Sequence, residues 1–123
     1  MARLVSQRIE DILRAISNCE DYVQLISSEP RLTRIGEDAI ERNLQIIGDA
    51  VKTLPGTLTE AYPEIPWPQI RGLRNILVHE YFGVDIELVF EVVRIYLPPL
   101  KHCLESLEVL EQDGDVVEFR FNV

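Results

Sequence analysis

Residues 39–55, AIERNLQIIGDAVKTLP, carry apolar side chains at the three- and four-residue spacing of an amphipathic helix. The apolar stripe consists of Ala39, Ile40, Leu44, Ile47 and Val51. The pattern stops before Pro55 and Gly56, and upstream it begins near Thr33, a candidate N-cap residue. Because one apolar face must be covered by other elements, this stretch favours a helical bundle.

Three further segments have the same period. The first runs from Leu4 to about Ser27, the third from Pro68 to a glycine cap at Gly83, and the fourth from Asp85 to about Leu110. The stripe of the fourth segment consists of Ile86, Val89, Val93, Leu97, Leu100, Leu104, Leu107 and Leu110. The pair Pro98-Pro99 is expected to kink this helix or divide it in two.

The stretch between the second and third helices has a different composition. Residues 53–70, TLPGTLTEAYPEIPWPQI, include four prolines, which prevent a long helix from continuing. We expect an ordered connector in which Trp67 is packed as an anchor.

The C-terminal residues 116–123, VVEFRFNV, alternate apolar and polar side chains as an edge strand would. A lone strand is marginal in water, so it needs a partner, such as the same tail of a second subunit. The sequence therefore predicts an all-α, antiparallel four-to-five-helix bundle over residues 1–111 and an extended tail over residues 112–123.

Composition narrows the class of protein further. The chain has 123 residues, 46% of them apolar, which is enough for one hydrophobic core. Its net charge of −9 argues against broad electrostatic capture of nucleic acid. The two cysteines, Cys19 and Cys103, lie in helical apolar patterns and are expected to be free. The N-terminus has no apolar run long enough for a signal peptide or a membrane span, so we expect a cytoplasmic protein that does not enter a membrane.

Residues 74–81, RNILVHEY, place three polar side chains of chemical interest close together. On one straight helix Arg74 and Tyr81 differ by roughly 20° around the axis, and Arg71 lies on the same side. His79 is about 140° from Arg74 and closer to Asn75. On a single straight helix, the side chains of Arg74 and His79 therefore do not converge on one site. Either the helix ends at His79, or two copies of the segment converge across a two-fold axis.

Such a pair of copies could cleave RNA without a metal ion. That reaction needs a base for the 2′-hydroxyl proton, an acid for the leaving 5′-oxygen and a cation for the phosphate. Two histidines can supply the base and the acid, and arginine offers planar donors to phosphate. The alternative is that Arg74 and His79 are ordinary polar helix residues and that Tyr81 is a packed aromatic. The spacing alone leaves both interpretations open, and His102 beside Lys101 indicates only a solvated face.

No motif for a cofactor is present in the sequence. The chain lacks H-E-x-x-H, the E-x-x-H pairs of bundle di-iron sites, and the G-x-x-x-x-G-K-[ST] phosphate loop. We therefore expect neither a metal ion nor another cofactor.

R-x-x-x-x-H-x-Y, present as Arg74, His79 and Tyr81, resembles the signature of the HepT-type ribonuclease toxins of the HEPN class. Residues 39–55 also resemble that family's second helix, residues 62–85 its motif region and residues 97–101 its final helix. The resemblance covers roughly residues 4–111 and implies an all-α homodimer that cuts RNA without a metal ion at a cleft on the two-fold axis. It further implies a partner, a minimal nucleotidyltransferase antitoxin (MntA), that transfers AMP from ATP onto the motif tyrosine and silences the toxin.

Carried over to this chain, the resemblance implies that Arg74 stabilises the scissile phosphate and that His79 is the acid–base residue. Tyr81 would be the AMPylation site, and Asn75 could orient phosphate or imidazole. Arg71, beside the motif, is a candidate phosphate-binding or supporting residue. Arg42 and Asn43 lie in a family-like block and are further candidates of this kind, although Asn43 is also close enough to the apolar stripe to be structural.

Three functions remain to be distinguished. The first is a metal-independent endoribonuclease that acts as the toxin of a type VII-like toxin–antitoxin pair. The second is a non-catalytic helical dimer that binds nucleotide or docks a nucleotidyltransferase. The third is a structural bundle with no ligand. RNA cleavage that survives chelation but not His79→Ala would fit only the first.

Overall fold

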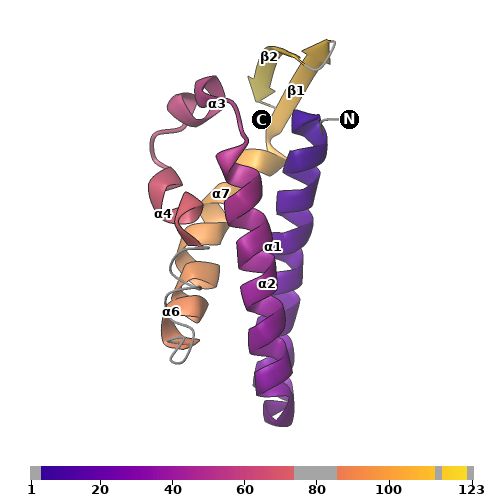
Figure 1. Cartoon of the computed structure of the whole chain (residues 1–123), viewed down its shortest axis with the longest axis vertical. Helices are drawn as coiled ribbons and strands as arrows, with labels where there is room; N and C mark the ends of the chain where they lie inside the picture. Colours follow the sequence, from indigo (N-terminus) through magenta and orange to yellow (C-terminus); the bar gives the residue numbers. More distant parts are fainter. Residues whose placement is uncertain (1–3, 74–85, 113–114, 122–123) are drawn as a thin grey trace.

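Two long antiparallel helices form the spine of the fold (Figure 1). The computed structural model describes residues 4–73, 86–112 and 115–121. Helix α1 spans Val5–Ser28, a 3-10 turn η1 spans Pro30–Leu32, and α2 spans Thr33–Lys52. Both helices confirm the apolar periodicity. The expected capping role of Thr33 is wrong, because Thr33 is already helical and its hydroxyl donates to the carbonyl of Pro30, the first residue of the preceding turn.

The proline-rich connector is ordered, as predicted, and contains two short helices. Helix α3 spans Gly56–Ala61 between two prolines, and α4 spans Trp67–Arg71 with Pro68 in its first turn. Trp67 is only 5% exposed, and its indole N–H donates to the Tyr62 carbonyl at 2.9 Å. This bond satisfies the one polar atom of a buried aromatic side chain, which makes Trp67 the anchor of the connector. The short helix α3 was not predicted.

The fourth predicted helix is divided, as the Pro98-Pro99 pair led us to expect. Helix α6 spans Ile86–Glu91, a π-helical segment η2 spans Val92–Tyr96, and α7 spans Leu97–Glu105. The Leu97 N–H donates to the Val92 carbonyl, five residues back, which is the hydrogen bond of a π-helix. The wider turn falls where Pro98 cannot donate to the residue four positions before it and its ring needs space.

Residues beyond Glu105 differ from the prediction. The helical stripe was expected to continue through Leu107 and Leu110, but these residues lie on strand β1, Leu107–Gln112. Strand β2, Asp115–Phe121, pairs with it in antiparallel register, with Val109 opposite Phe119. The predicted strand in the tail is thus confirmed, but its partner is β1 of the same chain. Val109, Val116 and Phe119 pack against the helical core from one face of this hairpin.

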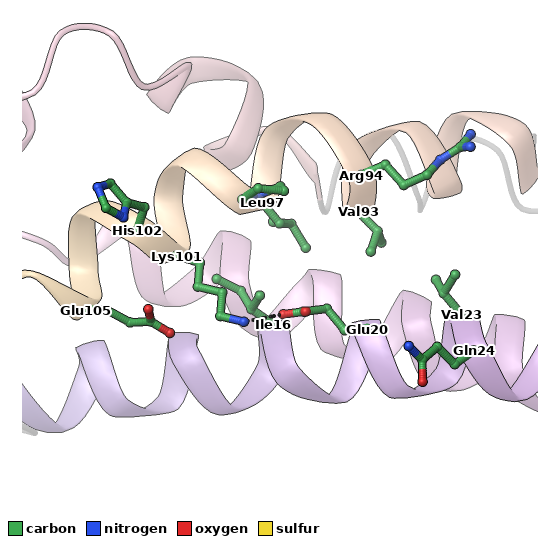
Figure 2. A pocket seen from close by; sticks show the side chains of 11 residues that line it. Ile16, Glu20, Val23, Gln24, Val93, Arg94, Leu97, Lys101, His102 and Glu105 are labelled. Atoms are coloured by element: carbon green, nitrogen blue, oxygen red, sulfur yellow. Dashed lines mark hydrogen bonds and ion pairs between the residues drawn. The ribbon is translucent and has the colours of Figure 1, made fainter.

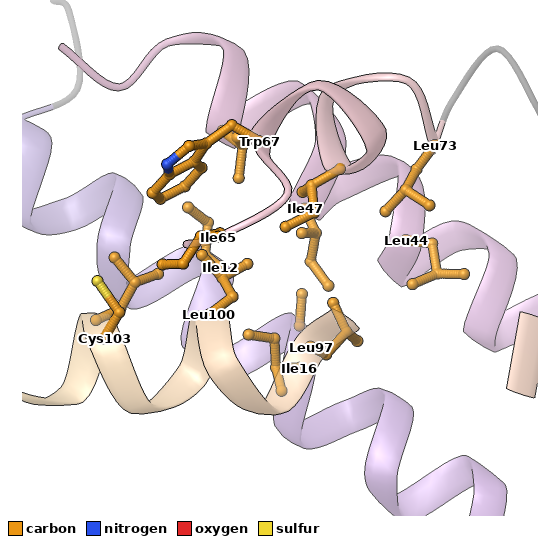
Figure 3. Close-up of a cluster of buried hydrophobic side chains, with 14 of the residues drawn as sticks. Ile12, Ile16, Leu44, Ile47, Ile65, Trp67, Leu73, Leu97, Leu100 and Cys103 are labelled. Carbon is orange, nitrogen blue, oxygen red and sulfur yellow. The ribbon is translucent and has the colours of Figure 1, made fainter. Parts of the chain in front are cut away.

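The hydrophobic core lies where α1, α2 and α7 meet the connector (Figure 3). Its members include the fully buried Ile12, Ile16, Ile40, Leu44, Ile47, Leu97 and Leu100. Cys19 and Cys103 are free and buried, as predicted. Burial raises the pKa of the Cys19 thiol to about 12 and that of Cys103 to about 11, so both stay protonated and behave as small apolar groups.

The fold is therefore all-α with a small C-terminal hairpin. Within the described ranges, none of the helices combines the length and the apolar character needed to cross a membrane.

The carboxylate of Glu111 links the hairpin to the start of α1 by hydrogen bonds. Glu111 accepts hydrogen bonds from the backbone N–H groups of Val5 at 2.9 Å and Ser6 at 2.7 Å. These donors belong to the first turn of a helix, where N–H groups have no partner within the helix and a negative charge is favourable. Burial alone would raise the pKa of Glu111, but the hydrogen bonds from Ser6 and Val5 outweigh it and hold the pKa below its ordinary value.

We expect Glu111→Gln to lower the free energy of unfolding at pH 7 by about 0.3–1 kcal/mol, because the amide lacks the charge that α1 favours. A lowered pKa in the folded state means that this contribution is present above the unfolded pKa of about 4.3 and is lost as the pH falls through the folded pKa. Urea unfolding at pH 7 and at pH 3 measures this, with Glu108→Gln on the outer face of the same strand as the control. An equal difference between wild type and Glu111→Gln at both pH values would contradict the charged contact.

Candidate functional site

The motif residues Arg74, Asn75, His79 and Tyr81 lie outside the residues that the structure describes. What the structure describes is the pair of helices on either side of them and three further candidates. These candidates are Arg71, Arg42 and Asn43.

The helix that leads into the motif is held very close to α2. A Cβ atom at Gly48 would stand 3.2 Å from the Ile70 carbonyl oxygen and 3.6 Å from the Cβ of Leu73, so α4 rests on the bare backbone of α2 at this point. Leu73, the last described residue before the motif, is 3% exposed. Both α4 and α6 contact α2. The described segments before and after residues 74–85 therefore both pack on one common helix.

We expect Gly48→Ala to lower the RNA-cleaving activity that we propose below and to stabilise the protein less than an alanine normally does in a helix. Alanine favours a helix over glycine by about 1 kcal/mol, but the added methyl must push the Ile70 carbonyl away, and overpacking costs about 1–3 kcal/mol. The matched control is Gly56→Ala, whose Cβ would have no atom within 4 Å. Thermal unfolding and cleavage rates of the two variants test this, and identical behaviour would show that the close approach is unimportant.

Arg71 and Arg42 are on different sides of α2. Arg71 is the half-buried last residue of α4, and its carbonyl oxygen would be 3.8 Å from a Cβ at Gly48. Arg42 is exposed and lines a shallow surface pocket with Arg8, Asp11 and Asp49. Positions 42 and 48 are about 120° apart around the helix axis. Within one chain, the structure does not bring the two arginines together.

The side chain of Asn43 makes its hydrogen bonds to residues of the same chain. It is 8% exposed, its amide N–H donates to the Ala39 carbonyl at 2.8 Å, and its side-chain oxygen accepts from the amide of Asn18 at 3.1 Å. These bonds satisfy a buried amide and join α2 to α1, which supports the structural alternative for Asn43. A supporting role at the site stays a prediction. Asn18 was not predicted to matter, and its position beside the apolar stripe of α1 was the available signal.

A groove of about 420 Å³ lies between α1 and the η2–α7 region (Figure 2). Its floor includes Ile16 and Leu97, and Lys101 bonds to Glu20 across it at 3.0 Å. This hydrogen bond raises the pKa of the Lys101 ammonium. His102 lies at the rim and is exposed, as its sequence context indicated. Of the described candidates, none of Arg42, Asn43 and Arg71 lines the groove, and the charge of its lysine is paired with a glutamate.

Comparison with known proteins identifies the class. The model of the ribonuclease HepT-like family matches residues 12–107, so the chain belongs to the HepT-like family. The protein "Probable ribonuclease HepT" of Thermococcus cleftensis is 36% identical over 108 residues, which are 87% of this chain and 98% of that protein.

A longer relative extends the similarity to the hairpin. The protein "Gamma-glutamylcyclotransferase and putative RNase" of Methanocaldococcus jannaschii is 35% identical over 124 residues, which cover 100% of this chain but only 55% of that protein. No solved structure matches the chain significantly.

Proposed function

We propose that this protein is a metal-independent endoribonuclease that acts in the cytoplasm as the toxin of a type VII-like toxin–antitoxin pair. The observation that carries the proposal is the family match over residues 12–107, which contains the whole of RNILVHEY. Membership of a ribonuclease family supports RNA as the substrate. The complete set of Arg74, Asn75, His79 and Tyr81 supports catalysis rather than docking alone, because a scaffold has no need of an imidazole at that position.

In this proposal the active site is composite and lies at the cleft of a homodimer. One histidine, as neutral imidazole, takes the 2′-hydroxyl proton, and the 2′-oxygen attacks phosphorus. The bond to the 5′-oxygen breaks, and the protonated His79 of the second copy gives this oxygen a proton. Arg74 holds the negative charge that develops on the phosphate oxygens, with Asn75 and Arg71 in support.

The charge of the chain limits where RNA can bind. At −9 the protein as a whole repels a polyanion, so productive contact is confined to the local cations of the cleft. The same reasoning supports silencing by an MntA-type nucleotidyltransferase. An AMP group on Tyr81 adds negative charge and bulk beside Arg74, and both oppose an RNA phosphate.

The direct test of metal independence is the rate of cleavage of labelled total RNA with and without excess chelator. The purified chain must have an intact mass that shows Tyr81 unmodified. We expect equal rates in the two conditions, because the proton transfers and the charge stabilisation come from side chains. A rate that collapses in chelator and returns with magnesium would contradict a metal-independent site. No cleavage in either condition would favour a non-catalytic module that docks the nucleotidyltransferase.

A further inference from the structure

Among the described residues, one edge of the C-terminal hairpin has no partner strand. In the part of the chain that the structure describes, the sheet has two strands, so β2 pairs with β1 along one edge only. Strand β1 contacts α1 and lies beside its first turn, while β2 is on the side away from α1 (Figure 1). No described strand pairs with the second edge of β2, so its backbone groups can pair with another strand.

The sequence of β2 is complementary to itself in antiparallel register. Glu118 and Arg120 flank Phe119 on the outer face, where they form an exposed ion pair at 3.1 Å within the strand. If two copies of β2 pair about a two-fold axis at Phe119, each Glu118 stands opposite the Arg120 of the other copy. Two ion pairs then form across the axis, and apolar residues meet apolar residues on the inner face. Opposite charges directly across antiparallel strands are favourable, and like charges are not.

The register within the hairpin extends this charge complementarity from β2 to β1. Arg120 is opposite Glu108 on β1, and Phe119 is opposite Val109. A four-stranded sheet built from two hairpins would therefore carry an outer row of Glu108, Arg120 and the second copy's Glu118, in which the charges alternate. The inner row would join Val109 and Phe119 to their equivalents. We propose that the free edge of β2 is an interface for a second copy of this chain, joined through residues 118–120.

Two features of the hairpin limit the strand pairing to one edge of each chain. The register shifts between Leu110 and Glu111, where their partners are Glu118 and Val116, so Val117 is an extra residue in a β-bulge. The bulge limits regular pairing to the stretch that starts at Glu118. On the other side, Glu111 of β1 is bound to the first turn of α1. With one usable edge per chain, the strand contact taken alone joins two copies and no more.

The strand contact is small, and its size determines how much it contributes to association of two chains. A strand pair of about four residues buries less than the roughly 1,200 Å² at the lower end of specific interfaces. Its contribution is therefore greatest when another surface already holds two copies together, because the second contact is then intramolecular. The inference does not depend on nuclease activity, and its test requires no RNA.

Cysteine cross-linking tests the register directly in the full-length chain. Glu118→Cys and Arg120→Cys are purified separately, mixed, and exposed to a mild oxidant, with disulfide-linked dimer measured on a non-reducing gel. We expect the mixture to give severalfold more dimer than either variant alone, because position 118 faces position 120 of the other copy and not itself. The control mixture of Glu118→Cys with Glu108→Cys places the thiols two strands apart and should not cross-link. Cys19 and Cys103 are buried and can remain.

Charge reversal provides a second, independent measurement. Glu118→Arg alone and Arg120→Glu alone place like charges opposite each other, so each weakens self-association. Mixed together they restore both ion pairs, and the weight-average mass in sedimentation should rise above that of either variant. A variant with a damaged hairpin could not be rescued by mixing. Equal cross-linking in all mixtures, or none in the 118–120 mixture, overturns the proposal and leaves the β2 edge to a different protein.

Discussion

We expect Arg74→Ala to lower the rate of RNA cleavage by at least ~10²–10³-fold while leaving the dimer intact, the loss typical of removing one donor from a charge-stabilising site. In the proposed mechanism Arg74 interacts with the phosphate most strongly as charge develops, so the loss falls on the chemical step. The measurement is the single-turnover rate on labelled RNA, together with the molar mass from light scattering.

The matched control for Arg74→Ala is Arg31→Ala. Arg31 is an exposed arginine whose side chain bonds to Glu29, two residues away, at 3.0 Å. Its removal takes away the same charge from the chain and should leave the rate unchanged. If Arg74→Ala falls apart to monomers, Arg74 is structural. If it cleaves like Arg31→Ala, the phosphate-binding role is wrong.

Transfer of AMP to Tyr81 should abolish cleavage, and Tyr81→Phe should be resistant to this silencing. The phenylalanine keeps the ring and loses only the hydroxyl that accepts the nucleotide. The variant should therefore cleave RNA within a few-fold of the wild type when neither is modified. After incubation with an MntA-type nucleotidyltransferase and ATP, the wild type should lose activity and gain the mass of AMP.

The result for Tyr81→Phe separates two sources of inhibition. If this variant is silenced as well as the wild type, the antitoxin acts by binding or modifies another residue. If the wild type gains the mass of AMP and still cleaves RNA, the modification does not block the cleft. A Tyr96→Phe variant, which alters a half-buried tyrosine next to Pro98-Pro99, controls for general effects of the substitution.

Local rules predicted most of the helical fold. The stripes of Ile12 and Ile16 on α1, and of Ile40, Leu44 and Ile47 on α2, are the buried residues of the core. Pro98-Pro99 divides the last helix because the cause, a missing N–H and a bulky ring, is contained in two adjacent residues.

The prediction failed where a distant segment decides the structure. Leu104, Leu107 and Leu110 continue a helical period, but Leu107 and Val109 also stand on either side of Glu108 with the two-residue spacing of a strand. The alternation prevails because β2, beginning at Asp115, places a paired residue opposite each residue of β1. A pattern that fits both periods cannot be resolved from its own residues. For the same reason the tail's own residues did not indicate that β1 of the same chain is its partner along one edge.

The motif site stays a prediction from the sequence. The spacing of Arg74 and His79 left two interpretations open, the family resemblance favoured catalysis, and these residues lie outside the described part of the chain. Asn43 was ambiguous because its partner, Asn18, is 25 residues away on another helix. Gly48 carried a signal that went unused, since a glycine inside a helical pattern often marks a close approach of another backbone. Here that approach is α4, the helix that leads into the motif.

The chain has only two histidines, and this allows a decisive comparison. His79→Ala and His102→Ala remove the same side chain, one from the motif and one from an exposed position on α7. Each is assayed beside the wild type on labelled total RNA in excess chelator, with unmodified Tyr81 verified by intact mass. We predict cleavage by the wild type and by His102→Ala and a loss of roughly 10²–10⁴-fold for His79→Ala. Equal cleavage by all three proteins would contradict RNILVHEY as the active site.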